Sequence, residues 1–178
     1  TVLDPVDLWE LADRSSHLDG PNVVLLDHTV VRFLPGNLTE ETVQQVWLVR
    51  NAEASRSLKR HHVPYVPERQ RLRVLQARIL RRDGSEISAR RQDSPRLSEP
   101  ELNIYYDTRL RVFAFDDLME GDMIEISTVV TETAEANETG AYEGGILRLG
   151  HSAPTLLAEI ELSGPQDMMP AWELAHLE

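Results

Sequence analysis

The sequence predicts an all-β protein, namely an antiparallel β-sandwich of about eight strands with a short N-terminal helix. Segments in which apolar and polar residues alternate recur along the chain. This period of two is typical of strands with one buried face, because successive side chains point to opposite faces. Short turn signals separate these segments without helical crossovers, which indicates antiparallel sheets. A single open sheet would leave one apolar face in water, so we expect two packed sheets.

Residues 101–133 carry the clearest strand pattern and are predicted to form an antiparallel hairpin with long arms. In the first arm, Leu110 lies on the apolar parity and Arg109 on the polar parity. Leu110 is therefore expected to be buried between two sheets, and Arg109 to be exposed. Gly121-Asp122 is expected to form the turn, with a positive φ at the glycine and an aspartate that caps the turn through its own backbone.

The other elements follow in chain order. A short helix is expected to open the chain, with Trp9 docking it against the body. Residues 51–62 have weak helical character, and residues 92–101 read as a polar loop. Asp83-Gly84 favours a tight hairpin turn, because the twist of such turns suits paired strands. Further strands are expected at residues 23–34, 43–50, 72–81, 86–90, 146–149 and 156–162.

A chain of 178 residues suits one domain, with or without an added arm. We expect residues 1–21 to be a helical arm or a linker from a preceding module, and residues 22–165 to be the β-sandwich. Residues 166–178 are expected to be a C-terminal linker, in which Leu177-Glu178 resembles the remnant of a purification tag. Both ends suggest a piece of a larger protein.

The composition excludes several kinds of site. The chain has no cysteine, which excludes thiolate zinc sites, iron–sulfur clusters and thiol nucleophiles from it. No apolar run approaches the roughly 20 residues that span a bilayer, so no direct membrane insertion is expected. The first residues do not have the pattern of a signal peptide. The absence of cysteine does not decide the cellular compartment.

Charge is distributed unevenly along the chain, whose formal net charge is −12. Residues 1–55 carry −6, residues 56–96 carry +8 and residues 97–178 carry −14. The basic block could bind nucleic acid. Alternatively, basic strands pair with acidic strands in the same sheet. The second interpretation is favoured, because the acidic segments would repel phosphate, and no nucleic-acid partner is expected.

Histidines are the most tempting residues for catalysis or metal binding. His61 and His62 are adjacent, and adjacent side chains of an extended chain point to opposite faces, so they are not expected to share one ion. His28 and His151 can each be drawn into a Ser/His/Asp set, but the G-x-S-x-G spacing of a nucleophile elbow is absent. We therefore expect no catalytic residue and no metal ligand.

Four carboxylates around the turn of the expected hairpin can be interpreted in two ways. They belong to Asp116, Asp117, Glu120 and Asp122. They could hold calcium through oxygen ligands, but they lack the spacing of a known calcium loop. Carboxylates are also common in polar turns between strands, and this interpretation is favoured. No Gly-rich phosphate loop occurs either, so no cofactor is expected.

A binding surface is the remaining possibility. Tyr105 and Tyr106, with Trp47 or Phe113, could form an aromatic platform for a sugar. Tyr106 lies on the apolar parity, which favours core packing, whereas Tyr105 remains a candidate binding residue. Arg109 and Arg111 lie on the polar parity of the same strand, so we expect these three residues to form any site for a peptide or a glycan.

Six segments, read together, resemble a known bacterial family. They are Val24–Val31, Pro64–Pro67, Val74–Ser85, Tyr105–Asp107, Arg111–Val112 and Gly121–Glu125. The family is the domain of unknown function that lies immediately before transglutaminase-like domains, which have the cysteine-protease fold, in exported or membrane-associated proteins. The resemblance spans roughly residues 22–165. Order and spacing carry it, since no single motif is specific.

This resemblance implies an immunoglobulin-like sandwich and a periplasmic or otherwise extracytoplasmic location. It implies a non-catalytic accessory domain, whose partner is the transglutaminase-like domain of the same chain that would carry the catalytic residues. A peptide- or glycan-binding module is the alternative function. An independent hydrolase that uses histidine and carboxylates is the least favoured, and we expect no enzymatic activity.

Overall fold

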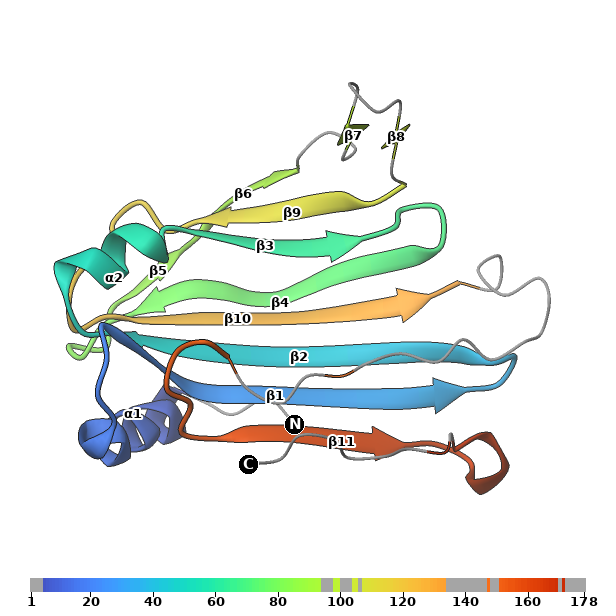
Figure 1. Ribbon diagram of the computed structural model, residues 1–178, viewed down its shortest axis with the longest axis horizontal. Coiled ribbons are helices and arrows are strands. Elements are labelled where there is room, and N and C mark those ends of the chain that lie inside the picture. Colours follow the sequence, from blue (N-terminus) through green and yellow to red (C-terminus); the bar gives the residue numbers. More distant parts are fainter. Residues whose placement is uncertain are drawn as a thin grey trace.

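A computed structural model describes residues 5–93, 98–99, 104–105, 107–133, 147, 151–169 and 171. These residues form a β-sandwich with one short N-terminal helix, as the sequence predicted (Figure 1). The helical segments are α1 (Pro5–Arg14), η1 (Ser15–His17), α2 (Ala52–Ser57) and η4 (Gln166–Met168). The strands are β1 (Asn22–Leu34), β2 (Leu38–Val49), β3 (Arg60–Tyr65), β4 (Gln70–Leu80), β5 (Glu86–Ser88), β6 (Arg90–Asp93), β7 (Ser98–Glu99), β8 (Ile104–Tyr105), β9 (Arg109–Ala114), β10 (Met123–Glu132) and β11 (Ala158–Ser163).

The larger sheet has six strands in the order β11-β1-β2-β10-β4-β5. Its neighbours run antiparallel, except that the edge strand β11 runs parallel to β1. The smaller sheet has the order β3-β9-β6, and β7 pairs with β8 in a separate two-stranded ribbon. The long strands β1 and β2 meet at a turn in which Gly36 and Asn37 have positive φ, as suits these two residue types.

The predicted hairpin of residues 101–133 is wrong in its pairing. Its two arms are strands, but β9 pairs with β3 and β6, whereas β10 pairs with β2 and β4. The segment around Gly121 therefore carries the chain from one sheet to the other. Alternation of residues shows that a segment is a strand, but it does not choose the partner, and the long β10 matches the long strands β2 and β4 better than the six-residue β9.

The predicted register of β9 is also wrong. Phe113 is fully buried, and it lies on the same parity as Arg109, whereas Leu110 is only half-buried. Two phenylalanines, Phe113 and Phe115, outweigh Leu110 and its smaller parity neighbours, because a phenylalanine buries more apolar surface. The side chains of Arg109, Arg111 and Phe113 therefore lie on the face of β9 that points toward the larger sheet. Arg109 is half-buried rather than exposed.

The region expected to be helical before the prolines contains a strand that the sequence did not predict. Helix α2 is only six residues long, and the Asn51 side chain caps it by accepting the backbone N–H of Ala54 at 2.9 Å. Strand β3 follows and includes Pro64. Because β3 is an edge strand of its sheet, a proline there is tolerated. The strand expected at 146–149 lies outside the described residues except for Leu147, which is not in a strand.

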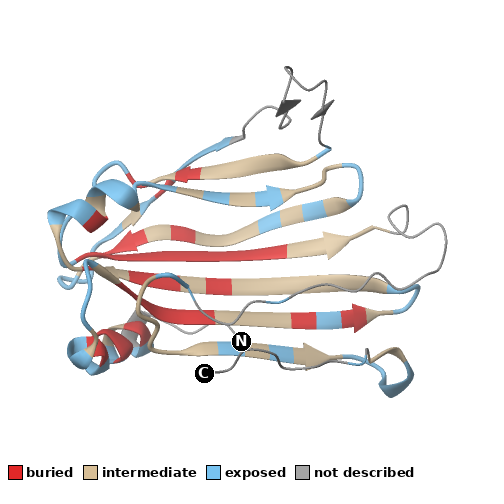
Figure 2. Ribbon diagram, viewed as in Figure 1, coloured by how far each residue is buried: buried red, intermediate tan, exposed pale blue. Residues whose placement is uncertain are grey.

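The core has two parts, one on each face of the larger sheet. Figure 2 shows that the buried residues gather in α1 and in the ends of the long strands nearest to α1 and α2. Between the sheets, Phe113 and Phe115 pack with Trp47, Ile79 and Ile124. On the opposite face, helix α1 buries its apolar side chains against the sheet.

Leu8 is fully buried in this second part, and Trp9 lies at its edge with the Arg82 guanidinium 4.9 Å from its ring centre. The predicted docking of the helix is thus present, although Leu8 makes the deeper contact.

Basic residues of the block 56–96 pair with acidic residues of other strands and turns. Arg78 binds the buried Glu125, and Arg90 binds Asp116. These ion pairs agree with the interpretation that the charged strands compensate one another. Among the described residues, no helix has the length and apolar character needed to cross a membrane.

Candidate functional site

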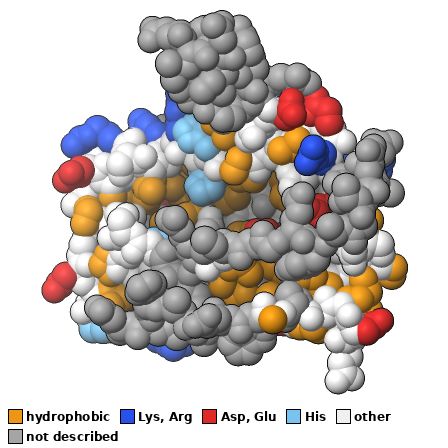
Figure 3. All heavy atoms as spheres, turned by 45° about the vertical axis from the view of Figure 1, so that its right-hand side comes forward, with side chains coloured by type: hydrophobic (Ala, Val, Ile, Leu, Met, Phe, Trp, Pro, Cys, Tyr) orange, Lys and Arg blue, Asp and Glu red, His pale blue; other side chains and the backbone are white. Residues whose placement is uncertain are grey.

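The inner face of the larger sheet changes from apolar to polar along its strands. Near α2, this face is packed by the core between the sheets. Farther along β1 and β2, it carries Asp27, Thr29, Glu41 and Gln45. Figure 3 shows histidine and hydrophobic side chains around a hollow on this side of the molecule. The polar part of the sheet is the best candidate for a functional site.

Asp27 is at the centre of this group and accepts two hydrogen bonds. Gln45 lies directly opposite it on β2 and donates from Nε2 to Asp27 Oδ1 over 3.0 Å. His151 lies 2.7 Å from the other carboxylate oxygen. Because a carboxylate can only accept, His151 Nε2 carries the proton in this contact and donates it to Asp27. The sequence separation of 124 residues explains why sequence reasoning did not pair them.

Trp47 links two histidines on the same face. Its ring centre is 5.0 Å from that of His61 and 6.2 Å from that of His151. Burial, together with the nearby charges of His62 and His151, lowers the pKa of His61 to about 4. His61 is therefore a neutral ring at pH 7, while His62 is exposed on the other face of β3, as expected for adjacent residues of a strand.

A cavity of about 260 Å³ adjoins this cluster. Its floor is the inner face of β1, β2 and β11, and Leu147 adds an apolar side chain. The lining residues are Asp27, Thr29, Glu41, Val43, Gln45, Leu147 and Ile160. Burial raises the pKa of Glu41, and no described residue forms an ion pair with its carboxylate.

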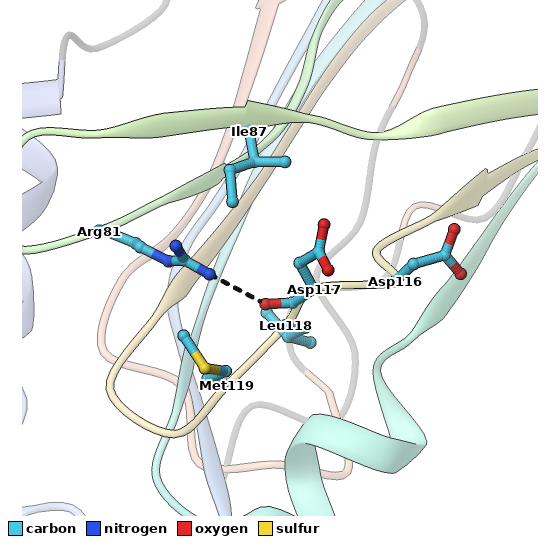
Figure 4. Close-up of a pocket in the computed structure, with 6 residues that line it drawn as sticks. All are labelled: Arg81, Ile87, Asp116, Asp117, Leu118 and Met119. Carbon is cyan, nitrogen blue, oxygen red and sulfur yellow. Dashed lines mark hydrogen bonds between the residues drawn. The ribbon is translucent and has the colours of Figure 1, made fainter.

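A second cavity, of about 420 Å³, lies beside the turn that follows β9. Figure 4 shows its lining residues, with the Arg81 side chain directed at the main chain of Asp117, where it donates to the carbonyl oxygen over 3.2 Å. Met119 is 53% exposed beside this cavity. The cavity therefore combines one fixed guanidinium with an exposed apolar side chain.

The residues expected to form this turn do so with one difference. Gly121 has φ +86°, and Asp122 Oδ2 accepts the backbone N–H of Met119 over 2.9 Å. Asp122 thus caps the turn through the backbone of a residue three positions earlier, not through its own, and it is buried. Asp116 pairs with Arg90 instead of converging with it. In the described part of the chain, no three His, Cys, Asp or Glu side chains gather as a metal site.

The other expected turn lies between β4 and β5. Gly84 has φ +84°, and the Asp83 carboxylate accepts the backbone N–H of Ser85 over 2.8 Å. The hydrogen bonds from Ser85 lower the pKa of the Asp83 carboxyl group. Asp83 and Gly84 therefore have the structural roles in the turn that the sequence predicted.

The candidate binding residues of β9 gather on the inner face of the smaller sheet. Arg109 pairs in register with Tyr65 of β3, and the Arg111 guanidinium is 5.8 Å from the Tyr65 ring centre. Arg109 Nε is buried and has no hydrogen-bond partner among the described residues. Tyr105 belongs to β8, but its side chain is outside the described part of the structure. Sequence reasoning did not identify Tyr65 as a site residue, because it lies between Pro64 and Pro67 in a segment where no strand was predicted.

The chemistry available at Asp27 is that of binding and orientation. A carboxylate that orients a histidine is half of a nucleophilic triad, but the other half requires a hydroxyl or a thiol within reach. The chain has no cysteine, and among the described residues no serine or threonine hydroxyl hydrogen-bonds to His151. Among the described residues, the Asp27–His151 pair therefore has no nucleophile hydrogen-bonded to it.

Comparison with known proteins agrees with this fold. Part of the chain aligns with the crystal structure of a candidate protease from Parabacteroides distasonis, with a TM-score of 0.56 and 12% identity. The alignment covers 64% of this chain but only 23% of that one. A CBM3a-L domain from a scaffoldin of the Clostridium thermocellum cellulosome aligns with a TM-score of 0.36 and 12% identity, over 73% of this chain and 81% of that one, and this similarity is too low to indicate a shared fold.

No curated protein matches the chain. Residues 36–177 match the model of a family that is described as a domain of unknown function with a solved structure, DUF3857. That match covers most of the chain, including every strand from β2 to β11. The chain therefore belongs to the DUF3857 family of domains.

Proposed function

We propose that this chain is a non-catalytic accessory domain of a longer bacterial protein, in which it packs against and positions a following transglutaminase-like domain. One observation carries the proposal: 64% of this chain aligns in structure with 23% of a longer chain that is described as a candidate protease. Two others support it. The chain lacks cysteine, so a cysteine-protease mechanism would have to be supplied by a neighbouring domain, and its Asp27–His151 pair has no hydroxyl bound to it among the described residues.

The surface that we expect to contact the neighbouring domain is the turn after β9. Met119 is one of two large hydrophobic side chains that are exposed in the described part of the chain, and Leu147 is the other. Exposed apolar side chains beside a hollow are typical of interaction surfaces. Asp117 and Arg81 at the same hollow supply polar groups for its rim. The proposed accessory role also places the domain outside the cytoplasm, with its parent protein.

The test begins with the gene that encodes this chain. We expect the sequence that follows residue 178 in it to encode a domain with catalytic Cys, His and Asp. That domain, produced separately, is expected to bind this chain in calorimetry, and Met119→Ser is expected to weaken the binding while Leu147→Ser leaves it unchanged. A chain that cleaves peptide or ester substrates by itself, or a neighbouring domain without a cysteine nucleophile, would contradict the proposal.

A peptide- or glycan-binding module is the second candidate function. The observation that favours it is the guanidinium group of Arg109, next to the Tyr65–Arg111 pair, because its buried Nε has no hydrogen-bond partner in the described part of the chain. Such groups can bind a carboxylate or a sugar hydroxyl. We expect specific retention on a glycan array or a peptide array to be lost in Arg109→Ala or Tyr105→Ala. The exposed Arg71 of β4 gives a matched control, Arg71→Ala, that should retain binding.

A further inference from the structure

We propose that the cavity on the inner face of β1, β2 and β11 binds a primary alkylammonium group, with the Glu41 carboxylate as its counter-ion. This inference does not rest on the accessory role proposed above. The ligand class comprises a lysine side chain of a peptide and a free alkylamine, which share this chemistry.

The unpaired charge of Glu41 is the first argument. Glu41 is half-buried in the cavity wall, and no described residue forms an ion pair or a hydrogen bond with its carboxylate. Its neighbour Glu40, on the opposite face of β2, has two partners: Arg32 at 3.4 Å and the Thr131 hydroxyl at 3.2 Å. A carboxylate that is withdrawn from water without a partner is unfavourable, so a bound cation would remove a cost that the free protein bears.

The shape of the cavity is the second argument. Val43, Ile160 and Leu147 supply apolar walls, which suit the methylene chain of an alkylamine. The volume of about 260 Å³ is enough for one such chain but not for a folded partner. Apolar walls beside a carboxylate that pairs with no described residue are an arrangement that can recognise a lysine-like group.

The second carboxylate of the cavity explains why the site would hold a single cation near Glu41. Both Asp27 oxygens already accept hydrogen bonds, from Gln45 and from His151. Asp27 therefore adds negative potential, while Glu41 is the free acceptor. A calcium ion would require 6–8 oxygen ligands, and the described residues gather no such set.

The experiment is an NMR titration of the whole chain, in which backbone amide shifts report binding residue by residue. The probes are Nα-acetyl-lysine methylamide, n-butylammonium chloride, and Nα-acetyl-norleucine methylamide, which has a similar chain without the charge. We expect the two ammonium compounds to shift the amides of Thr29, Val43 and Ile160 with saturation. The norleucine compound should not. Tighter binding of the lysine compound would assign the site to peptides, and equal binding would assign it to free amines.

Variants at neighbouring positions make the test specific. Glu41→Gln keeps the shape and removes the charge, and we expect it to weaken ammonium binding at least about tenfold, which corresponds to about 1.4 kcal/mol. Glu40→Gln is the matched control on the other face and should bind as the native chain does. The proposal is overturned if the norleucine compound binds equally well, if Glu41→Gln retains the affinity, or if no saturable shift appears. None of these outcomes bears on whether a neighbouring domain binds at Met119.

Discussion

Glu125 and Glu41 lie on the same sheet, on strands β10 and β2, and the fold treats their charges in opposite ways. Glu125 is fully buried, and both of its oxygens are used: Gln44 Nε2 donates to one over 2.8 Å, and Arg78 donates to the other over 2.7 Å. Glu41 is only half-buried, yet no described residue compensates it. The deeper carboxylate is thus the satisfied one, and the shallower carboxylate is left open.

His61 shows a third way to place a titratable group. No described carboxylate pairs with it, but it avoids the cost of burial by staying neutral, since its pKa is lowered to about 4. Glu125 therefore avoids the cost of a buried charge by pairing, and His61 avoids it by being neutral. Glu41 has neither a described partner nor a neutral ring. A partly buried charge that the fold does not compensate is a better indicator of ligand binding than a buried charge with a full set of partners.

The largest expected effect tests the compensated carboxylate. Arg78→Met should strand the buried charge of Glu125 and lower the free energy of unfolding by about 3–5 kcal/mol, the usual cost of removing one partner of a buried pair. Urea denaturation at pH 7 measures this. The double variant Arg78→Met/Glu125→Leu should recover much of the loss, because no unpaired charge remains. A loss below about 1 kcal/mol in the single variant would show that Glu125 is solvated and would remove the contrast with Glu41.

The next effect concerns the neutral histidine. The unfolded chain takes up a proton at His61 near pH 6.5, whereas the folded chain does so only near pH 4. Stability should therefore fall by up to about 3 kcal/mol as the pH drops from about 6.5 to about 4. At lower pH both states are protonated at His61, so this residue should cause no further loss of stability. Denaturation curves at several pH values measure the slope.

His61→Gln, which cannot be protonated, should lose this part of the pH dependence, while His17→Gln at an exposed position should keep it. An unchanged slope in His61→Gln would mean that the ring titrates normally in the folded state and is not protected by burial.

A smaller effect is expected at Asp27, which links the polar face to Trp47 through His151. Asp27→Ala removes the acceptor of two hydrogen bonds and should cost about 1–2 kcal/mol. Asp116→Ala, which breaks a surface ion pair with Arg90, should cost about 0–1 kcal/mol. Thermal denaturation of both variants gives the comparison. Equal, small losses would indicate that the Asp27–His151 contact is no stronger than a surface pair.

The smallest effect has the opposite sign and applies to the uncompensated carboxylate. Glu41→Gln should raise stability at pH 7 by about 0.5–1 kcal/mol, within the range of single stabilising substitutions. Because burial raises the folded-state pKa of Glu41, the charged form weakens the fold at neutral pH, and the penalty fades as the pH falls and the folded and unfolded chains both become protonated. The gain should therefore disappear at low pH, and Glu40→Gln should show no gain at pH 7.

Local signals predicted much of the secondary structure. The β-branched and apolar residues of β1, the alternation in β11, the turn at Asp83-Gly84 and the positive φ of Gly121 all depend on residues within a few positions of one another. Strand β3 was missed because its sequence, RHHVPY, contains a proline and few β-branched residues, and its pairing with β9 outweighs that weak propensity.

The sequence alone determined that residues 109–114 and 123–132 are strands, but only the tertiary structure decided which strands they join and which face of β9 is buried. Both choices depend on competition between distant segments for partners of matching length and for apolar surface, as the burial of Phe113 in place of Leu110 shows. The candidate site has the same origin. Asp27 and His151 are 124 residues apart, and Glu41 differs from other carboxylates because no cation of the described residues pairs with it. Three-dimensional packing decides which distant side chains meet, so a local pattern of residue types does not predict either feature.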